Sequence, residues 1–208
     1  MLLNKCVINL TMTRDKFFEI IDKKVGLEDR EQIEWAYALA KQFHREQMRD
    51  EGVRYFEHCR DVALILVKYG PTSPDELVVG FLHDIYEDQF VPRGMIKQLF
   101  GNKVNEALKI LSHEKPFYKS HGKITKTSES KKEYFGLIRD GSILVRRVKL
   151  ADRLHNVLTL EFCKPEKRVR KIKETEEYIL PIAKETDMRF FKAIKNKCDY
   201  WNHKHYEK

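Results

Sequence analysis

The sequence predicts an all-α protein. Apolar residues recur at helical spacing from one end of the chain to the other, and sustained alternation of apolar and polar residues, which is typical of strands, is lacking. Glycines, prolines and capping residues divide this pattern into segments of helix length. The 208 residues suffice for one domain, or for one domain with a small appendage.

Capping residues and glycines divide the first half of the chain into helices. Thr13 can cap the first of them, and Gly70 ends the third. Ser73 and Glu76 form a capping box with Pro74 at the first helical position, so a further helix begins there. The helices predicted in this half cover residues 15–24, 27–47, 62–69 and a segment from 74 through 88.

Helical spacing continues in the second half with one interruption. Gly101 separates a short predicted helix over residues 92–100 from another over 104–111. Residues 113–130 are polar, rich in lysine and prone to turns, so we expect a mobile loop of the kind that covers functional sites. The remaining helices are predicted at residues 133–139, 143–160, 165–178 and 187–205.

The net charge of +8 is unevenly distributed. Residues 1–100 carry 14 Lys/Arg and 17 Asp/Glu, whereas the remainder carries 26 and 15, so the two halves are −3 and +11. A basic second half predicts an anionic partner, either a phosphorylated small molecule or a nucleic acid. Solvated helix faces would explain the same pattern without a partner.

The four cysteines include no C-x-x-C pair, which argues against a zinc knuckle and a disulfide framework. The sequence contains neither an apolar run of about 18 residues nor the pattern of a secretory signal. We therefore expect a soluble, cytoplasmic protein with no membrane partner. The oligomeric state is not specified by the sequence.

Residues 83–88, HDIYED, place one imidazole and three carboxylates within an otherwise apolar segment. In a helix the four polar positions would span roughly 140° of the circumference. Burying so many ionisable groups without partners would cost on the order of several kcal/mol. We therefore expect a divalent cation at this segment.

Two further segments present the same ligand types amid apolar neighbours. The candidate ligands are His58, His83, Asp84 and Asp152. Two imidazoles and two carboxylates suit manganese, iron, magnesium or zinc, and the set lacks the thiolates of structural zinc sites. Such an ion would acidify a water molecule and polarise a phosphoryl group. Glu87 and Asp88 would then accept the proton of the water or orient it.

The order and spacing of these residues resemble the HD-domain phosphohydrolases, an all-helical superfamily. A narrower resemblance is to the hydrolase domain of RelA/SpoT-type enzymes, which remove pyrophosphate from the 3′ position of the alarmone ppGpp. FLHDIYED at residues 81–88 is similar to that family's LLHD-x-x-ED segment, and FGNKV at 100–104 to its FG-x-x-V segment. KLADRLHN at 149–156 matches the family motif throughout. The resemblance covers about residues 33–160.

The resemblance implies an HD helical bundle over residues 31–162, preceded by an N-terminal helical segment at 1–30 and followed by a C-terminal helical extension at 163–208. It implies Mn²⁺ as the ion held by the four candidate ligands, with Mg²⁺, Fe²⁺ or Zn²⁺ as alternatives, and the attacking water served by Glu87 and Asp88. The length leaves no room for a synthetase domain, so a stand-alone hydrolase is expected.

The substrate would be a small nucleotide. Asn156 and Thr159 would contact it by the same analogy. Arg49 stands in a matched motif, and Arg153 lies on the basic helix that carries Asp152, so both are expected to bind its phosphates.

The chain departs from the family where it reads RDEG at residues 49–52 in place of R-K-S-G. Asp50 and Glu51 would repel phosphate at a position where a basic residue is expected. Two alternatives to ppGpp hydrolysis therefore stay open. The first is an HD nucleotidase or phosphodiesterase acting on a deoxynucleotide, NADPH or a cyclic dinucleotide. The second is a non-catalytic module in which the metal is structural and the basic half binds nucleic acid.

Overall fold

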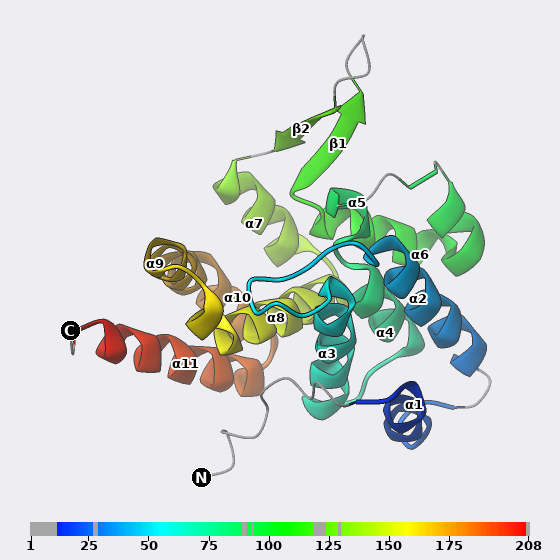
Figure 1. The fold of residues 1–208 in the computed structure, drawn as a ribbon, viewed down its shortest axis with the longest axis horizontal. Helices are drawn as coiled ribbons and strands as arrows, with labels where there is room; N and C mark the ends of the chain where they lie inside the picture. Colours follow the sequence, from blue (N-terminus) through cyan, green and yellow to red (C-terminus); the bar gives the residue numbers. More distant parts are fainter. Residues whose placement is uncertain are drawn as a thin grey trace.

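The structure is a computed structural model that describes residues 12–26, 29–88, 91–92, 94–118, 124–128 and 130–206. Helices dominate it, which confirms the predicted all-α class (Figure 1). The helices up to the strands are α1 (Arg14–Asp22), α2 (Arg30–Phe43), α3 (Tyr55–Lys68), α4 (Pro74–Leu82), α5 (Ile85–Asp88) and α6 (Met95–Leu111). After strands β1 (Glu114–Tyr118) and β2 (Ile124–Ser128) follow α7 (Lys131–Asp140), α8 (Ile143–Leu158), η2 (Leu160–Phe162), α9 (Pro165–Glu174), η3 (Thr175–Ile179), α10 (Leu180–Thr186) and α11 (Met188–Tyr206).

Helix α4 is the centre of the core, because it packs against α2, α3, α6 and α8. It begins at the predicted capping box, in which both reciprocal hydrogen bonds between Ser73 and Glu76 are present. Its apolar side chains, from Leu77 to Leu82, are completely buried. Gly80 lets α3 approach closely, since a Cβ at this position would lie 2.9 Å from Cδ1 of Leu66. This close packing brings the C-terminal end of α4 beside α3.

The predicted helix over residues 74–88 is wrong at its middle. Helix α4 ends at Leu82 and α5 begins at Ile85, so His83 and Asp84 occupy the turn between them. The Nδ1 atom of His83 lies 2.8 Å from the carbonyl oxygen of Gly80. In a continuous helix this oxygen would accept a hydrogen bond from the backbone N–H of residue 84. The imidazole N–H thus competes with a backbone N–H for this carbonyl oxygen at the point where the helix ends.

The predicted boundary at Gly101 is a kink inside α6, where this glycine has a φ of 83°. A positive φ is accessible to glycine at little cost, which explains why the kink falls at this residue. The two predicted helices are therefore two parts of one bent element.

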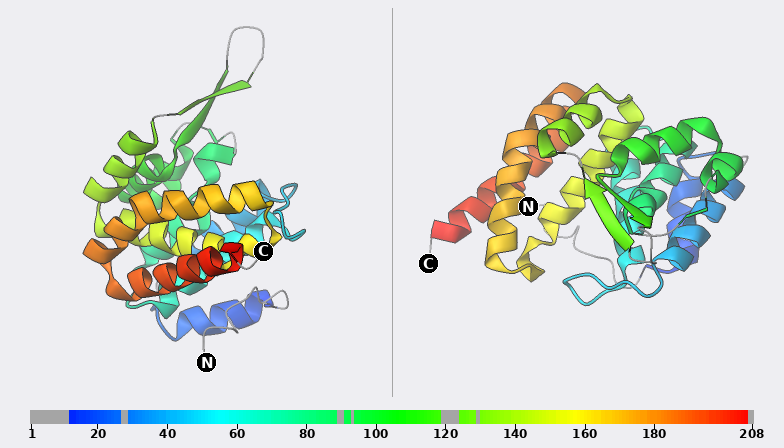
Figure 2. Two further views of the ribbon diagram at one scale, coloured as in Figure 1. Left: turned by 90° about the vertical axis from the view of Figure 1, so that its left-hand side faces the viewer. Right: turned by 90° about the horizontal axis from the view of Figure 1, so that it is seen from above.

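The loop predicted over residues 113–130 is instead largely a two-stranded hairpin. Strands β1 and β2 pair antiparallel, from Glu114 opposite Ser128 to Tyr118 opposite Ile124. The hairpin projects from the helical body and contacts α5 through β1 (Figures 1 and 2). The predicted covering role of this segment rests partly on residues 119–123, which lie outside the described residues, as do residues 1–11 of the predicted N-terminal segment.

The C-terminal helices share the core of the domain. Helices α10 and α11 pack on α8, and the indole nitrogen of Trp201 donates a hydrogen bond of 3.0 Å to the carbonyl oxygen of Val157. Phe190, near the start of α11, is fully buried. In the part of the chain that the structure describes, none of the helices is long and apolar enough to span a membrane. The division at residues 30 and 162 stays a prediction.

Candidate active site

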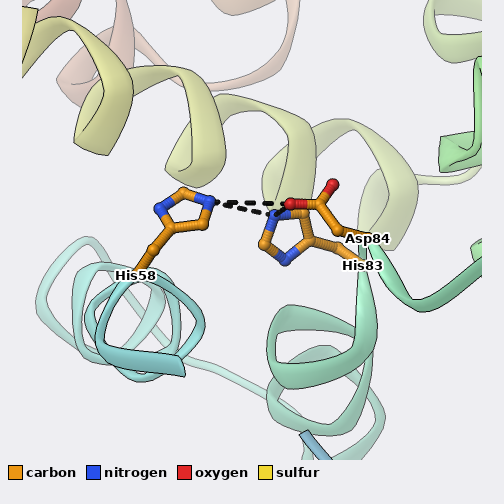
Figure 3. Close-up of side chains that lie close together, drawn as sticks. All are labelled: His58, His83 and Asp84. Atoms are coloured by element: carbon orange, nitrogen blue, oxygen red, sulfur yellow. Dashed lines mark hydrogen bonds and ion pairs between the residues drawn. The ribbon is translucent and has the colours of Figure 1, made fainter. Parts of the chain in front are cut away.

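The four predicted metal ligands converge on one point. His58 comes from α3, His83 and Asp84 from the turn after α4, and Asp152 from α8 (Figure 3 shows the first three). The Nε2 atoms of the two histidines are 3.2 Å apart, and Nε2 of His83 is 2.9 Å from Oδ2 of Asp84. Oδ1 of Asp152 lies 3.4 Å from Nε2 of His58. The donor set is thus assembled from three elements that are distant in sequence.

Hydrogen bonds on the far side of each ring orient both imidazoles toward the cluster. Nδ1 of His83 donates to the carbonyl oxygen of Gly80. Nδ1 of His58 lies 2.9 Å from Nδ1 of His155, whose Nε2 faces Oδ2 of Asp61 at 3.5 Å. When His155 donates from Nε2 to Asp61, its Nδ1 accepts the hydrogen of His58. The Nε2 atoms of both rings are thereby directed toward the cluster.

The charges of the cluster also fit a metal ion. Burial lowers the pKa of His58 well below its ordinary value, and the Arg49 cation lowers it further. Burial also opposes protonation of His83, but the carboxylates of Asp84 and Asp152 and a backbone carbonyl together outweigh it and raise the pKa of His83 to about 9. The metal-free cluster therefore holds a proton on His83, between the donor atoms. A divalent cation would replace that proton, as metal binding to imidazoles requires.

Both carboxylates are held in their charged form. Burial alone would raise the pKa of Asp84, but the neighbouring His83 cation lowers it below its usual range. In Asp152 burial is outweighed by the combined effect of Lys149, whose Nζ lies 3.0 Å from Oδ2, and of His58 and His83, and the pKa falls well below its ordinary value. Ligand atoms of His58, His83 and Asp84 lie within 4.8 Å of one another. Geometry and charge thus agree that these residues can hold a divalent ion.

Tyr55 is part of the site, although sequence reasoning did not assign it a role. Its hydroxyl donates a hydrogen bond to Oδ2 of Asp84, and its ring stacks on His44 with 4.9 Å between centroids. Burial and the charge of Asp84 raise the pKa of Tyr55 well above its ordinary value, so it keeps its proton as a donor. Because Tyr55 stands three residues before His58, the sequence indicates that it lies near the metal ligands. The sequence does not indicate its hydrogen bond to Asp84.

A cleft of about 300 Å³ opens beside the cluster. Its lining includes Asp84, Asp152 and Glu87, whose Oε1 accepts the backbone N–H of His113. Burial and the charge of Asp84 raise the pKa of Glu87. Asp88 is not among the described residues that line the cleft. A larger cavity of about 910 Å³ lies at α2 and α3, but we assign the chemistry to the smaller one because none of the candidate ligands lines the larger.

Three of the four predicted substrate contacts lie together in this cleft. The guanidinium of Arg49 donates to Oδ1 of Asn156 at 3.0 Å and lies 3.5 Å from Oγ1 of Thr159. All three residues line the cleft. The amide nitrogen of Asn156 also donates to Oδ1 of Asp152, which links the substrate side of the cleft to the metal side.

The fourth predicted contact, Arg153, lies elsewhere. It is buried and is not part of the described cleft lining; its guanidinium contacts Oε1 of Glu174 at 2.7 Å and Oγ1 of Thr175 at 3.2 Å. Adjacent residues on a helix point about 100° apart. Because Asp152 faces the cluster, Arg153 faces the C-terminal helices, and we propose a structural role for it in place of the predicted substrate contact.

The acidic pair that departs from the family motif is neutralised by cations of the chain itself. Glu51 accepts a hydrogen bond of 3.1 Å from Nε of Arg49. Asp50 forms an ion pair with Lys167 of α9 and accepts a hydrogen bond of 3.2 Å from the thiol of Cys163. Sequence reasoning missed Lys167, because its partner is 117 residues away.

The sequence matches the family model described as "HD domain" over residues 36–188. The chain therefore belongs to the HD-domain family.

Several curated proteins are similar to it. It is 30% identical over 193 residues to a guanosine-3′,5′-bis(diphosphate) 3′-pyrophosphohydrolase of Spiroplasma citri, covering 90% of this chain and 25% of that protein. It is 34% identical over 179 residues to the protein of the same name of Aquifex aeolicus, covering 84% and 24%. A GTP pyrophosphokinase of Streptomyces coelicolor is 33% identical over 171 residues, covering 82% and 20%. The chain spans a quarter or less of the length of these relatives.

The fold is shared with solved structures. One of them is that of a metazoan ortholog of SpoT, a protein that hydrolyses ppGpp, and the two superpose with a TM-score of 0.67 at 21% sequence identity. The match covers 80% of this chain and 93% of the other. This likeness supports the helical HD fold.

Proposed function

We propose that the protein is a metal-dependent phosphohydrolase that removes pyrophosphate from the 3′ position of ppGpp. The observation that carries this proposal is the convergence of His58, His83, Asp84 and Asp152 beside a cleft that also holds Glu87. Two of the similar proteins are named as 3′-pyrophosphohydrolases of this alarmone, which supports the choice of substrate.

We propose Mn²⁺ as the ion, held by these two histidines and two aspartates. When bound, it would lower the pKa of a water molecule and polarise the phosphoryl group. The charges of the cleft favour such an ion: among the described residues, its lining has four Lys/Arg residues and five Asp/Glu residues, a net charge of −1. A divalent cation changes this sum to +1, which suits a polyanionic substrate.

Glu87 is the proposed general base. Its Oε1 is held by the His113 backbone, which leaves Oε2 to accept the proton of the attacking water. Asp88, the second carboxylate of α5, is proposed to support it. Arg49, Asn156 and Thr159 would position the nucleotide, since they meet in the same cleft.

A second candidate function is the hydrolysis of a different nucleotide by the same chemistry. It is favoured by Asp50 and Glu51, which neutralise Lys167 and Arg49 on the substrate side of the cleft, where the family motif has a basic residue. A deoxynucleotide, NADPH or a cyclic dinucleotide would then replace ppGpp.

A panel of nucleotides incubated with the Mn²⁺-loaded protein tests both candidates. We expect ppGpp to yield GDP and pyrophosphate, and Asp152→Ala protein to yield neither. Faster cleavage of another nucleotide would favour the second candidate. An absence of hydrolysis together with RNA binding that weakens steeply with salt would reject both and favour a non-catalytic module.

A further inference from the structure

In the part of the chain that the structure describes, four cationic side chains line the cleft, and three of them are paired with carboxylates. Arg49 is paired with Glu51 at 3.1 Å, and Lys149 with Asp152 at 3.0 Å. Lys167 is paired with Asp50. These three cations are therefore compensated before a substrate arrives. The fourth is Lys171, on α9.

Lys171 has no hydrogen-bonding or ion-pair partner for its amino group among the described residues, although it is partly buried. The neighbouring carboxylate of Glu174 is already engaged: Oε1 binds Arg153 at 2.7 Å and Oε2 binds Lys131 at 2.6 Å. Burial lowers the pKa of Lys171, and the Arg153 cation lowers it further. An ammonium group in this situation is stabilised by an incoming anion.

Lys171 lines the same cleft as Asp84, Glu87 and Asp152, the residues of its metal end. Lys167, one helical turn earlier on α9, instead pairs with the loop between α2 and α3. A lysine is a point charge with three donors, which suits a phosphate group of adjustable orientation.

We propose that Lys171 binds the pyrophosphoryl group that is cleaved from the nucleotide, an assignment that rests on the proposed function. The loop at Asp50 and Glu51 has acidic residues where the family motif has a basic one. Lys171 then supplies the missing cation from α9, a helix outside the matched motifs. A nucleotide that lacks the 3′ pyrophosphate makes no use of this contact.

Calorimetric binding of ppGpp and GDP to metal-free protein in EDTA tests this assignment without turnover. We expect Lys171→Met to weaken the binding of ppGpp about 10-fold or more, which is typical of a lost hydrogen bond to a charged group, and to change that of GDP less than about twofold. Lys171→Arg should retain most of the ppGpp affinity. Lys173→Met, an exposed lysine of the same helix that does not line the cleft, is the matched control and should resemble wild type.

Three results would overturn the assignment: equal ppGpp affinity of Lys171→Met and wild type, a parallel loss of GDP affinity, or no ppGpp binding by wild-type protein. Lys171→Gln provides a second neutral variant if Lys171→Met does not fold, as judged by circular dichroism. Turnover of ppGpp by Mn²⁺-loaded wild type is measured separately. Absence of ppGpp turnover would contradict the proposed function. An unchanged ratio of ppGpp affinity to GDP affinity in Lys171→Met would contradict the Lys171 assignment.

Discussion

The two ends of the cleft differ in what their charged groups do. At the metal end, His58, His83, Asp84 and Asp152 direct donor atoms to one point, and hydrogen bonds behind them fix their orientation. At the rim of the cleft, formed by residues 48–51 and by Lys167 of α9, charges neutralise one another. In the proposed function, the metal end carries the reaction chemistry, and the charge left unpaired at the rim influences which substrate binds.

Replacement of the proposed base is expected to have the largest effect on turnover. Glu87→Gln keeps the size and the hydrogen bond from His113 but cannot accept a proton. We expect kcat to fall about 10²- to 10⁴-fold while bound Mn²⁺ is unchanged. Steady-state kinetics and metal analysis of the same sample check this. Loss of metal together with activity would instead place Glu87 among the ligands.

The pH dependence of the wild type tests the same role. A general base acts only when it is deprotonated, so kcat should fall as the pH drops through the pKa of Glu87 in the enzyme–substrate complex. Burial and Asp84 raise that pKa above the ordinary value of 4.5 in the metal-free protein. The residual activity of Glu87→Gln should lack this acidic limb. An acidic limb that persists in the variant would assign the titration to another group.

Arg153→Met separates a structural arginine from one that binds substrate. The change leaves Glu174 partly buried without its Arg153 partner, so we expect the free energy of unfolding to fall by about 2 kcal/mol, a value reduced from that of a fully buried pair because Glu174 is partly exposed. The KM of the folded variant should match that of the wild type. Denaturant unfolding and kinetics measure both quantities. A higher KM with unchanged stability would restore the sequence-based assignment.

The smallest effect is expected at the rim. Asp50→Asn frees Lys167 from an ion pair in which both side chains are 42% exposed. Because exposed pairs contribute at most about 1 kcal/mol, we expect KM for ppGpp to fall no more than about fivefold, with kcat unchanged. A larger fall would mean that Asp50 contacts the substrate directly. An increase in KM would mean that its carboxylate is needed for binding.

The metal end could be predicted from the sequence because its ligands stand in short motifs within apolar segments. Local signals also placed most helices, including the start of α4 at its capping box. The break at His83 depends on a hydrogen bond from the side chain to the backbone, which periodicity does not reveal. The hairpin pairs two segments that lack alternating apolar residues.

The rim was harder to predict, because its contacts join distant parts of the chain. Asp50 and Glu51 were expected to repel phosphate, yet each has a cationic partner in the structure. The direction of Arg153 depends on which face of α8 packs against the C-terminal helices. Helix α9 belongs to the predicted C-terminal extension but lines the cleft, so the extension is proposed to take part in substrate binding.

The most direct test of the account is the Mn²⁺ content and ppGpp turnover of Asp84→Ala beside the wild type. Wild-type protein should bind one ion per chain and hydrolyse ppGpp. Asp84→Ala should lose the bound ion, and its turnover should fall at least about a thousandfold, because a Lewis acid supplies several kcal/mol of transition-state stabilisation. An Asp84→Ala protein that binds Mn²⁺ and hydrolyses ppGpp as the wild type does would contradict the proposed site.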